Sequence, residues 1–183
     1  YYVMQFVDAW TNNFAYLGRR ATGTEEGTFL IAGPDWNGQA PEGMTLIQSP
    51  TKVFAIVGRV AVVGEADIPN VLAIQDETWV SPLSQYPERP DTGKRAFGDW
   101  NLAPYDDRVG DDLRFWEQMR AWLKLLPPPE AEAEYLRKFK PLGLLADKSP
   151  YIDPDPDLAE TLISGEAEFN DFLENAVVQS SKI

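Results

Sequence analysis

KVFAIVGRVAVV, residues 52–63, is the stretch of this 183-residue chain that most strongly predicts its fold. Most of its apolar residues are β-branched, and the run ends at Gly64. β-branched side chains favour strands because they pack well on a pleated surface, and glycine commonly bounds a strand. The stretch therefore predicts a long β-strand, and the residues on either side predict what surrounds it.

Four shorter strands are predicted upstream. Tyr1–Val7 is apolar on both faces, which is typical of a central strand. Phe14–Arg20 and Thr28–Ala32 are separated by a polar segment bounded by glycines, so we predict a hairpin between them. A further short strand is predicted around Met44–Gln48. The first part of the chain is therefore predicted to be built on β-structure.

Helical patterns follow the strands. Asp67 is predicted to cap a helix over Ile68–Glu77. Three more helices are predicted from caps and prolines: one that begins after Asp111 or Asp112 and ends before Pro127, one over Glu130–Lys140, and one that begins at Asp155-Pro156 and is weakened at Gly165. Strands followed by helices indicate the α+β fold class.

The same patterns divide the chain into three parts. We predict a β part over residues 1–80, a long irregular connection over 81–110 and a helical connector over 111–183. A domain seldom begins in a core strand, so we expect that further residues precede Tyr1 in the intact protein.

Apolar spacing predicts the buried helix faces. Phe115, Met119, Trp122 and Leu126 form one stripe, which we interpret as core; a ligand groove between helices is the alternative. The last helix is defined by apolar residues at positions 158, 162, 169, 172, 173 and 176.

Charge and composition limit the function classes. The chain carries 29 acidic and 16 basic side chains, a net charge of −13. Such a surface repels nucleic acid and anionic membranes, so neither is a predicted partner. The surface is either simply well solvated or complementary to a cationic partner.

No apolar run reaches about 18 residues, the length that a membrane span needs. The absence of Cys and His removes disulfides, thiolate metal sites and the usual general base, and we predict no cofactor, no metal site and no catalytic residue.

Two charged residues lie within apolar strands. Arg59 shares its predicted face with Ala55 and Val57, and Asp8 shares its face with Phe6. A charge in such a place must be paired or lie at a sheet edge. Pairing Asp8 with Arg59 or Arg20 would satisfy both groups in a buried ion pair. The alternatives are an Arg59 that anchors a carboxylate or phosphate ligand, and simple surface exposure.

Trp36 lies in the middle of the loop Gly33–Gly38. It is interpreted either as a plug over the end of the β part or as a stacking platform for a sugar or other ring. Asp8 and Asp35 could serve as the paired carboxylates of a glycosidase, although no spacing distinguishes them. The acidic segment Asp153–Asp157 lacks the Gly and Glu of an EF-hand, so a helix cap explains it better.

Several short motifs occur in one order: Tyr2-x-x-Gln5-x-x-Asp8, Gly18-Arg19-Arg20-x-Thr22-Gly23, Gly33-Pro34-x-Trp36-x-Gly38 and Gly58-Arg59. Over about residues 1–80 they resemble the bacterial family catalogued as domain of unknown function 1254. A looser resemblance continues through Phe115-Trp116 to the final helix. The family has no established catalytic residues to transfer.

This resemblance implies a fold and a context. The first part is expected to be an antiparallel β-sandwich of jelly-roll type, followed by a helical connector. The family also implies a secreted or periplasmic location, homo-oligomers and a second domain. The chain is therefore expected to begin inside the first domain, to stop before the second, and to contact those N- and C-terminal parts.

Two functions from different classes follow. The first is a non-catalytic binding or assembly module of a larger protein. The second is part of a hydrolase acting on a small or carbohydrate-like substrate, completed by regions outside this sequence. Its site would lie near Asp8, Arg19, Arg20, Trp36 and Arg59. A cleft lined by these residues favours the hydrolase, and a structural role for them favours the module.

Overall fold

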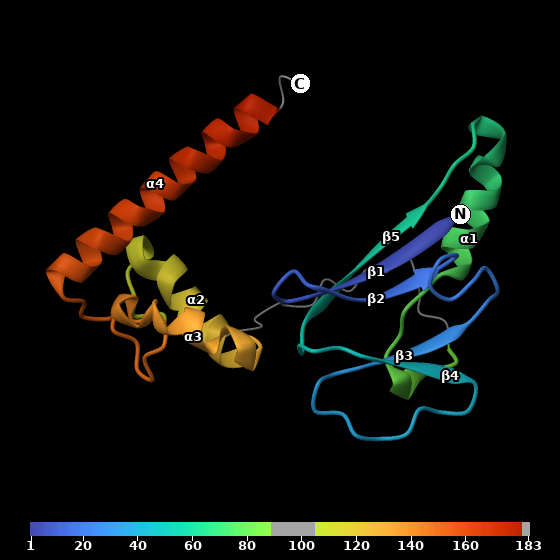
Figure 1. The fold of residues 1–183 in the computed structure, drawn as a ribbon, viewed down its shortest axis with the longest axis horizontal. Coiled ribbons are helices and arrows are strands. Elements are labelled where there is room, and N and C mark those ends of the chain that lie inside the picture. Colours follow the sequence, from blue (N-terminus) through green and yellow to red (C-terminus); the bar gives the residue numbers. More distant parts are fainter. Residues whose placement is uncertain (89–104, 181–183) are drawn as a thin grey trace. The chain divides into compact units, whose positions relative to one another are not determined.

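The computed structural model of the chain describes residues 1–88 and 105–180, with the side chains of 177–180 excepted. The chain divides into two compact units, residues 1–98 and 99–183. The first unit holds strands β1–β5 and helix α1, and the second holds helices α2, α3 and α4 (Figure 1). The predicted α+β class is therefore confirmed.

Three strands of the first unit form an antiparallel sheet, which we call sheet A. These strands are β1 (Tyr2–Asp8), β2 (Asn13–Gly18) and β5 (Phe54–Val60), in the order β2-β1-β5. β1 is central, as its apolar residues on both faces predicted. β5 is shorter than the predicted strand over residues 52–63.

The other two strands form a separate pair. β3 (Thr28–Ala32) and β4 (Met44–Gln48) occupy the predicted positions and run parallel to each other. The predicted hairpin between the second and third strands is wrong, because β2 pairs with β1 and β3 pairs with β4. The cause lies at Gly18, whose carbonyl accepts hydrogen bonds from the N–H groups of Ala21, Thr22 and Gly23. This compact turn ends β2 and directs the chain out of sheet A before β3 begins.

Three phenylalanines, one from each strand of sheet A, pack together on its inner face. Phe6 is almost fully buried, and the ring centroids of Phe14 and Phe54 lie 6.0 and 6.5 Å from that of Phe6. The Phe14 and Phe54 rings meet edge to face at 6.1 Å. Burial of these rings stabilises sheet A and fixes which face of each strand turns inward.

Helix α1 (Ile68–Glu77) has the predicted bounds and follows a 3-10 turn at Glu65–Asp67. Asp67 stands at the position before the helix, but the predicted cap is not formed: its Oδ2 accepts from the Val63 N–H at 2.9 Å and its Oδ1 from Asn70 Nδ2 at 3.2 Å, and it accepts no helix backbone N–H. A second 3-10 turn spans Leu83–Gln85. Most of the predicted irregular connection, residues 89–104, lies outside the described residues.

The second unit is helical. Its elements are the 3-10 turn Asp111–Leu113, α2 (Arg114–Leu125), the 3-10 turn Glu130–Glu132, α3 (Ala133–Arg137), the 3-10 turn Lys140–Leu142 and α4 (Pro156–Ser180). α2 stops before the prolines at 127–129, as predicted, and α4 runs through Gly165 without a break. Asp155 Oδ1 accepts hydrogen bonds from the N–H groups of Asp157 and Leu158, which confirms the predicted cap. In the two ranges that the structure describes, no helix has the length and apolarity needed to cross a bilayer.

The core of the second unit is formed by Val109, Leu113, Tyr151 and Leu162. The predicted apolar stripe of α2 is mostly wrong as a core face, because Phe115 and Met119 are exposed and Trp122 is half-buried; Leu126 alone is buried. The buried residues of α2 are instead Glu117, Arg120, Ala121 and Leu123. The two charged side chains can be buried on this face because Glu117 and Arg120 form an ion pair with each other.

Candidate functional site

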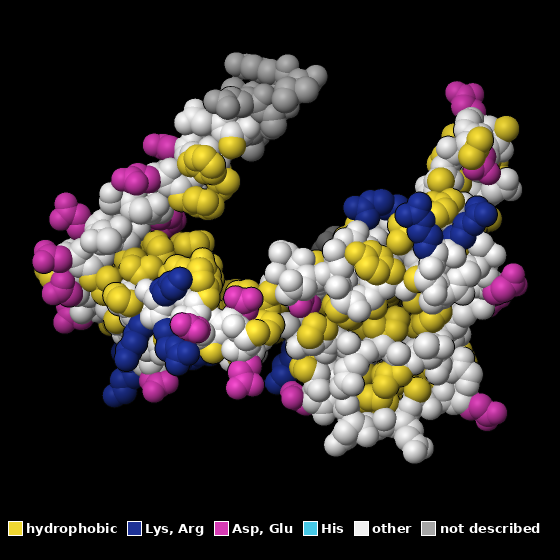
Figure 2. All heavy atoms as spheres, viewed as in Figure 1, with side chains coloured by type: hydrophobic (Ala, Val, Ile, Leu, Met, Phe, Trp, Pro, Cys, Tyr) yellow, Lys and Arg dark blue, Asp and Glu magenta, His cyan; other side chains and the backbone are white. Residues whose placement is uncertain are grey.

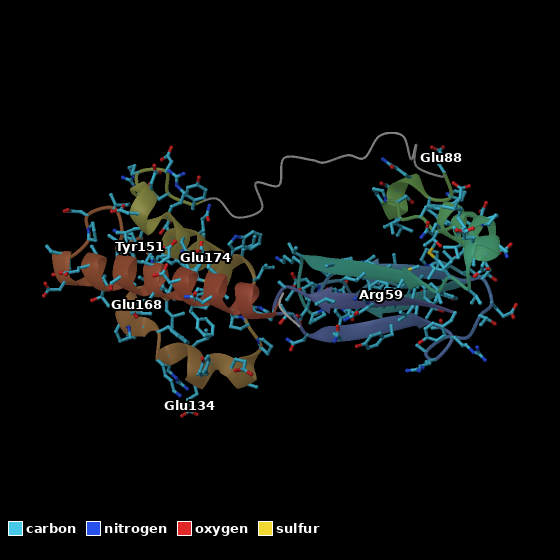
Figure 3. All side chains as sticks on the ribbon, turned by 90° about the horizontal axis from the view of Figure 1, so that it is seen from above. Arg59, Glu88, Glu134, Tyr151, Glu168 and Glu174 are labelled. Carbon is cyan, nitrogen blue, oxygen red and sulfur yellow. The ribbon has the colours of Figure 1, made fainter. Side chains whose placement is uncertain are left out.

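A chain of polar side chains crosses the outer face of sheet A. Arg59 in β5 lies directly across from Val3 in β1, and Val57 lies across from Gln5. Arg59 Nη1 donates to Gln5 Oε1 at 2.9 Å, and Gln5 Nε2 donates to Asn13 Oδ1 at 2.5 Å. Figure 3 shows Arg59 on this sheet. The three strands are therefore joined by one exposed hydrogen-bonded series, Arg59–Gln5–Asn13, with the exposed Tyr16 across from Gln5.

Asp8 lies on the other face and at the other end of sheet A. It faces Phe54, whereas Arg59 faces Val3, and the five steps between Val3 and Asp8 correspond to about 17 Å of strand. An odd number of steps also reverses the side of the sheet. The predicted pairing of Asp8 with Arg59 is therefore wrong, because the register separates them.

The buried Asp8 carboxylate holds the turn between β1 and β2. Oδ1 accepts hydrogen bonds from the N–H groups of Trp10 and Asn12 at 2.9 and 2.8 Å, and Oδ2 accepts one from Asn12 Nδ2 at 3.2 Å. Within this turn Thr11 has a φ of 65°, which is uncommon for a β-branched residue. Asp8 is thus a structural group whose oxygens are already engaged, and the predicted pair with Arg20 is not formed either.

Three arginines gather at the opposite end of β1. Gly18 and Arg59 are the two cross-strand neighbours of Val3, and Arg19 and Arg20 follow Gly18 directly. The Arg20 guanidinium lies 5.8 Å from the centroid of the Tyr1 ring. Residues 1–88 contain four basic side chains, of which Lys52 pairs with Asp35. Figure 2 shows basic side chains gathered at one end of this unit and a further one apart from them. We call Arg19, Arg20 and Arg59 the arginine cluster.

Trp36 lies in the loop that follows β3. Gln48 Nε2 donates to the carbonyl oxygens of Gly33, Pro34 and Trp36, at 3.4, 3.1 and 2.9 Å, so β4 holds this loop in place. Trp36 itself is half-buried, and the neighbouring Asp35 pairs with Lys52 at 3.4 Å. The proposed acid–base pair Asp8 and Asp35 gains no support, because Asp8 is buried in the turn after β1 and Asp35 is an exposed loop residue beside Lys52.

A buried ion pair that the sequence analysis missed organises the second unit. Arg120 Nε and Nη2 donate to Glu117 Oε2 and Oε1 at 2.8 and 2.7 Å, and Arg120 Nη1 donates to the Ala146 carbonyl at 3.2 Å. Glu117 Oε1 also accepts a hydrogen bond from the Asp106 N–H at 3.1 Å. Burial raises the pKa of Glu117, but the hydrogen bonds from Arg120, Ser149 and Asp106 outweigh it and hold that pKa below its ordinary value.

Tyr151 completes this buried centre. Its hydroxyl donates to the Leu142 carbonyl at 2.8 Å, and burial raises its pKa to about 12. Figure 3 shows Tyr151 beside α4. The sequence did carry a signal for the centre: Leu113, Glu117 and Arg120 are spaced four and three apart, on one helix face. In the part of the chain that the structure describes, no cluster of three or more Asp or Glu residues could hold a metal ion.

The comparisons with known proteins agree with the resemblance seen in the motifs. Residues 1–82 match the family described as Protein of unknown function (DUF1254), which confirms the resemblance over that range. No curated protein matches the chain.

A solved structure supports the fold over most of the chain. The VPA0106 protein from Vibrio parahaemolyticus matches with a TM-score of 0.63 and 21% sequence identity. The match covers 92% of this chain and 41% of that protein, so this chain spans about two fifths of the length of its structural relative. At this identity the likeness concerns the fold alone.

Proposed function

We propose that this chain, with residues 1–82 matching a family of unknown function, is a non-catalytic binding or assembly module of a larger secreted or periplasmic bacterial protein. In this proposal the first unit is part of a β-sandwich of jelly-roll type, to which neighbouring chain or a second copy adds strands. The secreted or periplasmic location rests on the family resemblance.

The main support for the proposal comes from strand β5. It has a strand partner on one side, β1, and none on the other among residues 1–88 and 105–180. Its central residues Ile56 and Val57 point to opposite faces of the sheet, and each is 37% exposed. Apolar residues on both faces are typical of a strand that is paired and covered on both sides. An outer strand with exposed N–H and C=O groups is a template for a further strand.

Helix α1 supports the same interpretation. Within it Val71 is the buried residue, while Ile68, Leu72 and Ile74 are exposed. A helix that is apolar on more than one side usually lies between two packed surfaces. A contact with another part of the assembly would bury these side chains.

The residues proposed for a hydrolase site do not favour catalysis. Asp8 and Arg59 lie on opposite faces of sheet A, and Trp36 belongs to the loop held by β4. Asp8 and Arg59 therefore do not face the same side of the sheet, as a site that used both would need. The contacts of Asp8 and Trp36 are those of structural residues.

Self-association through β5 tests the assembly role. The oligomeric mass of the full chain is measured by light scattering after size-exclusion chromatography, and hydrogen exchange of the β5 amides is followed over a range of concentrations. We expect a mass above that of the monomer, and protection of the β5 amides that rises with concentration.

Val57→Lys should shift the chain towards the monomer because a lysine on an outer strand opposes strand addition. Gln39→Lys, the same charge change in an exposed loop, should leave the mass unchanged. A monomer with concentration-independent exchange would overturn self-association through β5, so that only neighbouring chain could supply the added strand.

A further inference from the structure

Helix α4 carries one apolar seam along its length. We define the α4 seam as the residues spaced alternately four and three apart: Leu158, Leu162, Gly165, Phe169, Phe172 and Ala176. This spacing is that of the a and d positions of a heptad repeat, which pack against a neighbouring helix. α4 has 25 residues and is therefore about 37 Å long.

The two halves of the α4 seam differ in what covers them. In the first half, Leu162 is 1% exposed and packs in the core of the unit, with Leu158 beside it. In the second half, Phe169 is 56% exposed and Phe172 is 66% exposed. Figure 2 shows hydrophobic side chains gathered on one side of this distal half. The apolar surface that packs in the core in the first half of the seam therefore continues, uncovered, along the second half. This is expected if a partner packs on the second half.

The charges of α4 indicate which partner fits. The helix carries six acidic residues and no basic residue: Asp157, Glu160, Glu166, Glu168, Asp171 and Glu174. Glu166 and Glu168 occupy the e and g positions of the preceding heptad, Leu162–Glu168, and so flank the seam where its exposed half begins at Phe169. Figure 3 shows Glu168 and Glu174 on this helix. Residues at e and g set partner choice in helix pairs through charge, so cations fit beside this seam.

A second copy of α4 is the less suitable occupant. Pairing two α4 helices would bring together two surfaces that each carry six carboxylates and no cation. Like charges across a helix interface oppose association.

We propose that the distal half of the α4 seam is a docking site for an amphipathic helix of another protein chain, whose apolar residues are flanked by Lys or Arg. Phe169 and Phe172 are the apolar anchors, and Glu166 and Glu168 select the basic partner. The site extends the proposed assembly role to a partner of stated chemistry. It involves the second unit only, so the β5 experiment and the one below can fail independently.

Two designed helical peptides of about three heptads test this site. Both carry Leu at a and d, one carries Lys at e and g, and the other carries Glu there. Binding of each to the full chain is measured by calorimetry. We expect the Lys peptide to bind saturably and the Glu peptide not to bind.

Three variants separate the seam from general electrostatic attraction to an acidic chain. Phe169→Ser/Phe172→Ser keeps every charge and should weaken binding of the Lys peptide at least about tenfold. Val80→Ser/Leu83→Ser, a matched change at exposed apolar residues of the first unit, should leave binding unchanged. Glu166→Lys/Glu168→Lys should reverse the preference towards the Glu peptide. Circular dichroism checks that each variant is folded.

Three results would overturn the proposal. The first is equal binding of the Lys peptide to the chain and to the Phe169→Ser/Phe172→Ser variant, which would mean attraction by charge alone. The second is no saturable binding of either peptide. The third is loss of self-association in that variant, which would make a second copy the occupant of the seam.

Discussion

Arg120 and Glu117, one turn apart on α2, form a two-pronged ion pair inside the second unit. The two contacts are 2.8 and 2.7 Å long, and the Glu117 side chain has no exposed surface. Arg120 also donates to the carbonyl oxygens of Ala146 and Asp147, so the pair joins α2 to the segment that leads into α4. It is both an electrostatic pair and a connection between distant parts of the unit.

Removal of one partner should strongly destabilise the second unit. Arg120→Met leaves Glu117 buried without its cation, and the expected loss in the free energy of unfolding is about 3–5 kcal/mol. Urea unfolding followed by the helical circular dichroism signal measures it. The double variant Glu117→Met/Arg120→Met removes both charges and should lose less than Arg120→Met alone. A loss below about 1 kcal/mol for Arg120→Met would contradict a buried pair.

The second unit should lose stability at alkaline pH through Tyr151. The pKa of Tyr151 is raised from 10.0 to about 12 in the folded chain, chiefly by burial. The unfolded chain therefore releases the proton first, so stability is complete below pH 10 and falls as pH rises towards 12. The pH dependence of urea unfolding, with tyrosinate absorbance as a second signal, tests this. Tyr151→Phe should be less stable at neutral pH, because its hydrogen bond to Leu142 is lost, but should show a weaker alkaline decline.

Asp8 and Arg59 should differ sharply in their contribution to stability. Asp8→Ala removes three hydrogen bonds to a buried carboxylate and should cost about 2 kcal/mol or more. Arg59→Met removes one exposed hydrogen bond to the neutral Gln5 and should cost less than about 1 kcal/mol. Thermal melts of both variants beside the unmodified chain give the comparison. A large loss for Arg59→Met would contradict the exposed position and single neutral partner of Arg59.

Gly18 should tolerate no side chain. Its φ is 125°, and a Cβ atom there would lie 2.3 Å from the backbone oxygen of Tyr2, which is held in the sheet by β5. Gly18→Ala should therefore cost about 2 kcal/mol or more, since both strain and a backbone clash arise. Gly33→Ala is the matched control, because its Cβ meets open space and its φ needs no glycine. Equal thermal stability of the two variants would show that the turn after β2 can rearrange.

Local patterns in the sequence predicted the elements well. The bounds of β3, β4 and α1 agree with the predictions, and the Asp155 cap was identified from its neighbours. These features depend on residues close along the chain, such as β-branched runs, prolines and capping carboxylates. The central place of β1 followed from its apolar residues on both faces.

The relations between elements could not be predicted in the same way. The proposed pairing of Asp8 with Arg59 failed because the register of β1 and β5 decides the face, and one step along a strand reverses it. The prediction that Phe115 and Met119 face the core was wrong. The opposite face of α2 is buried instead, because the ion pair with Arg120 allows Glu117 to be buried. Both outcomes depend on contacts between residues that local patterns do not link.

The hydrogen bonds from Arg120 to the carbonyl oxygens of Ala146 and Asp147 have a mechanical consequence. These carbonyls belong to the short segment that ends where α4 begins, so the hydrogen bonds lie near the start of a helix about 37 Å long. A rotation of only about 5° at the start of this helix would move its far end by about 3 Å. Loss of the Arg120 hydrogen bonds would therefore displace a distant phenylalanine that the arginine never touches.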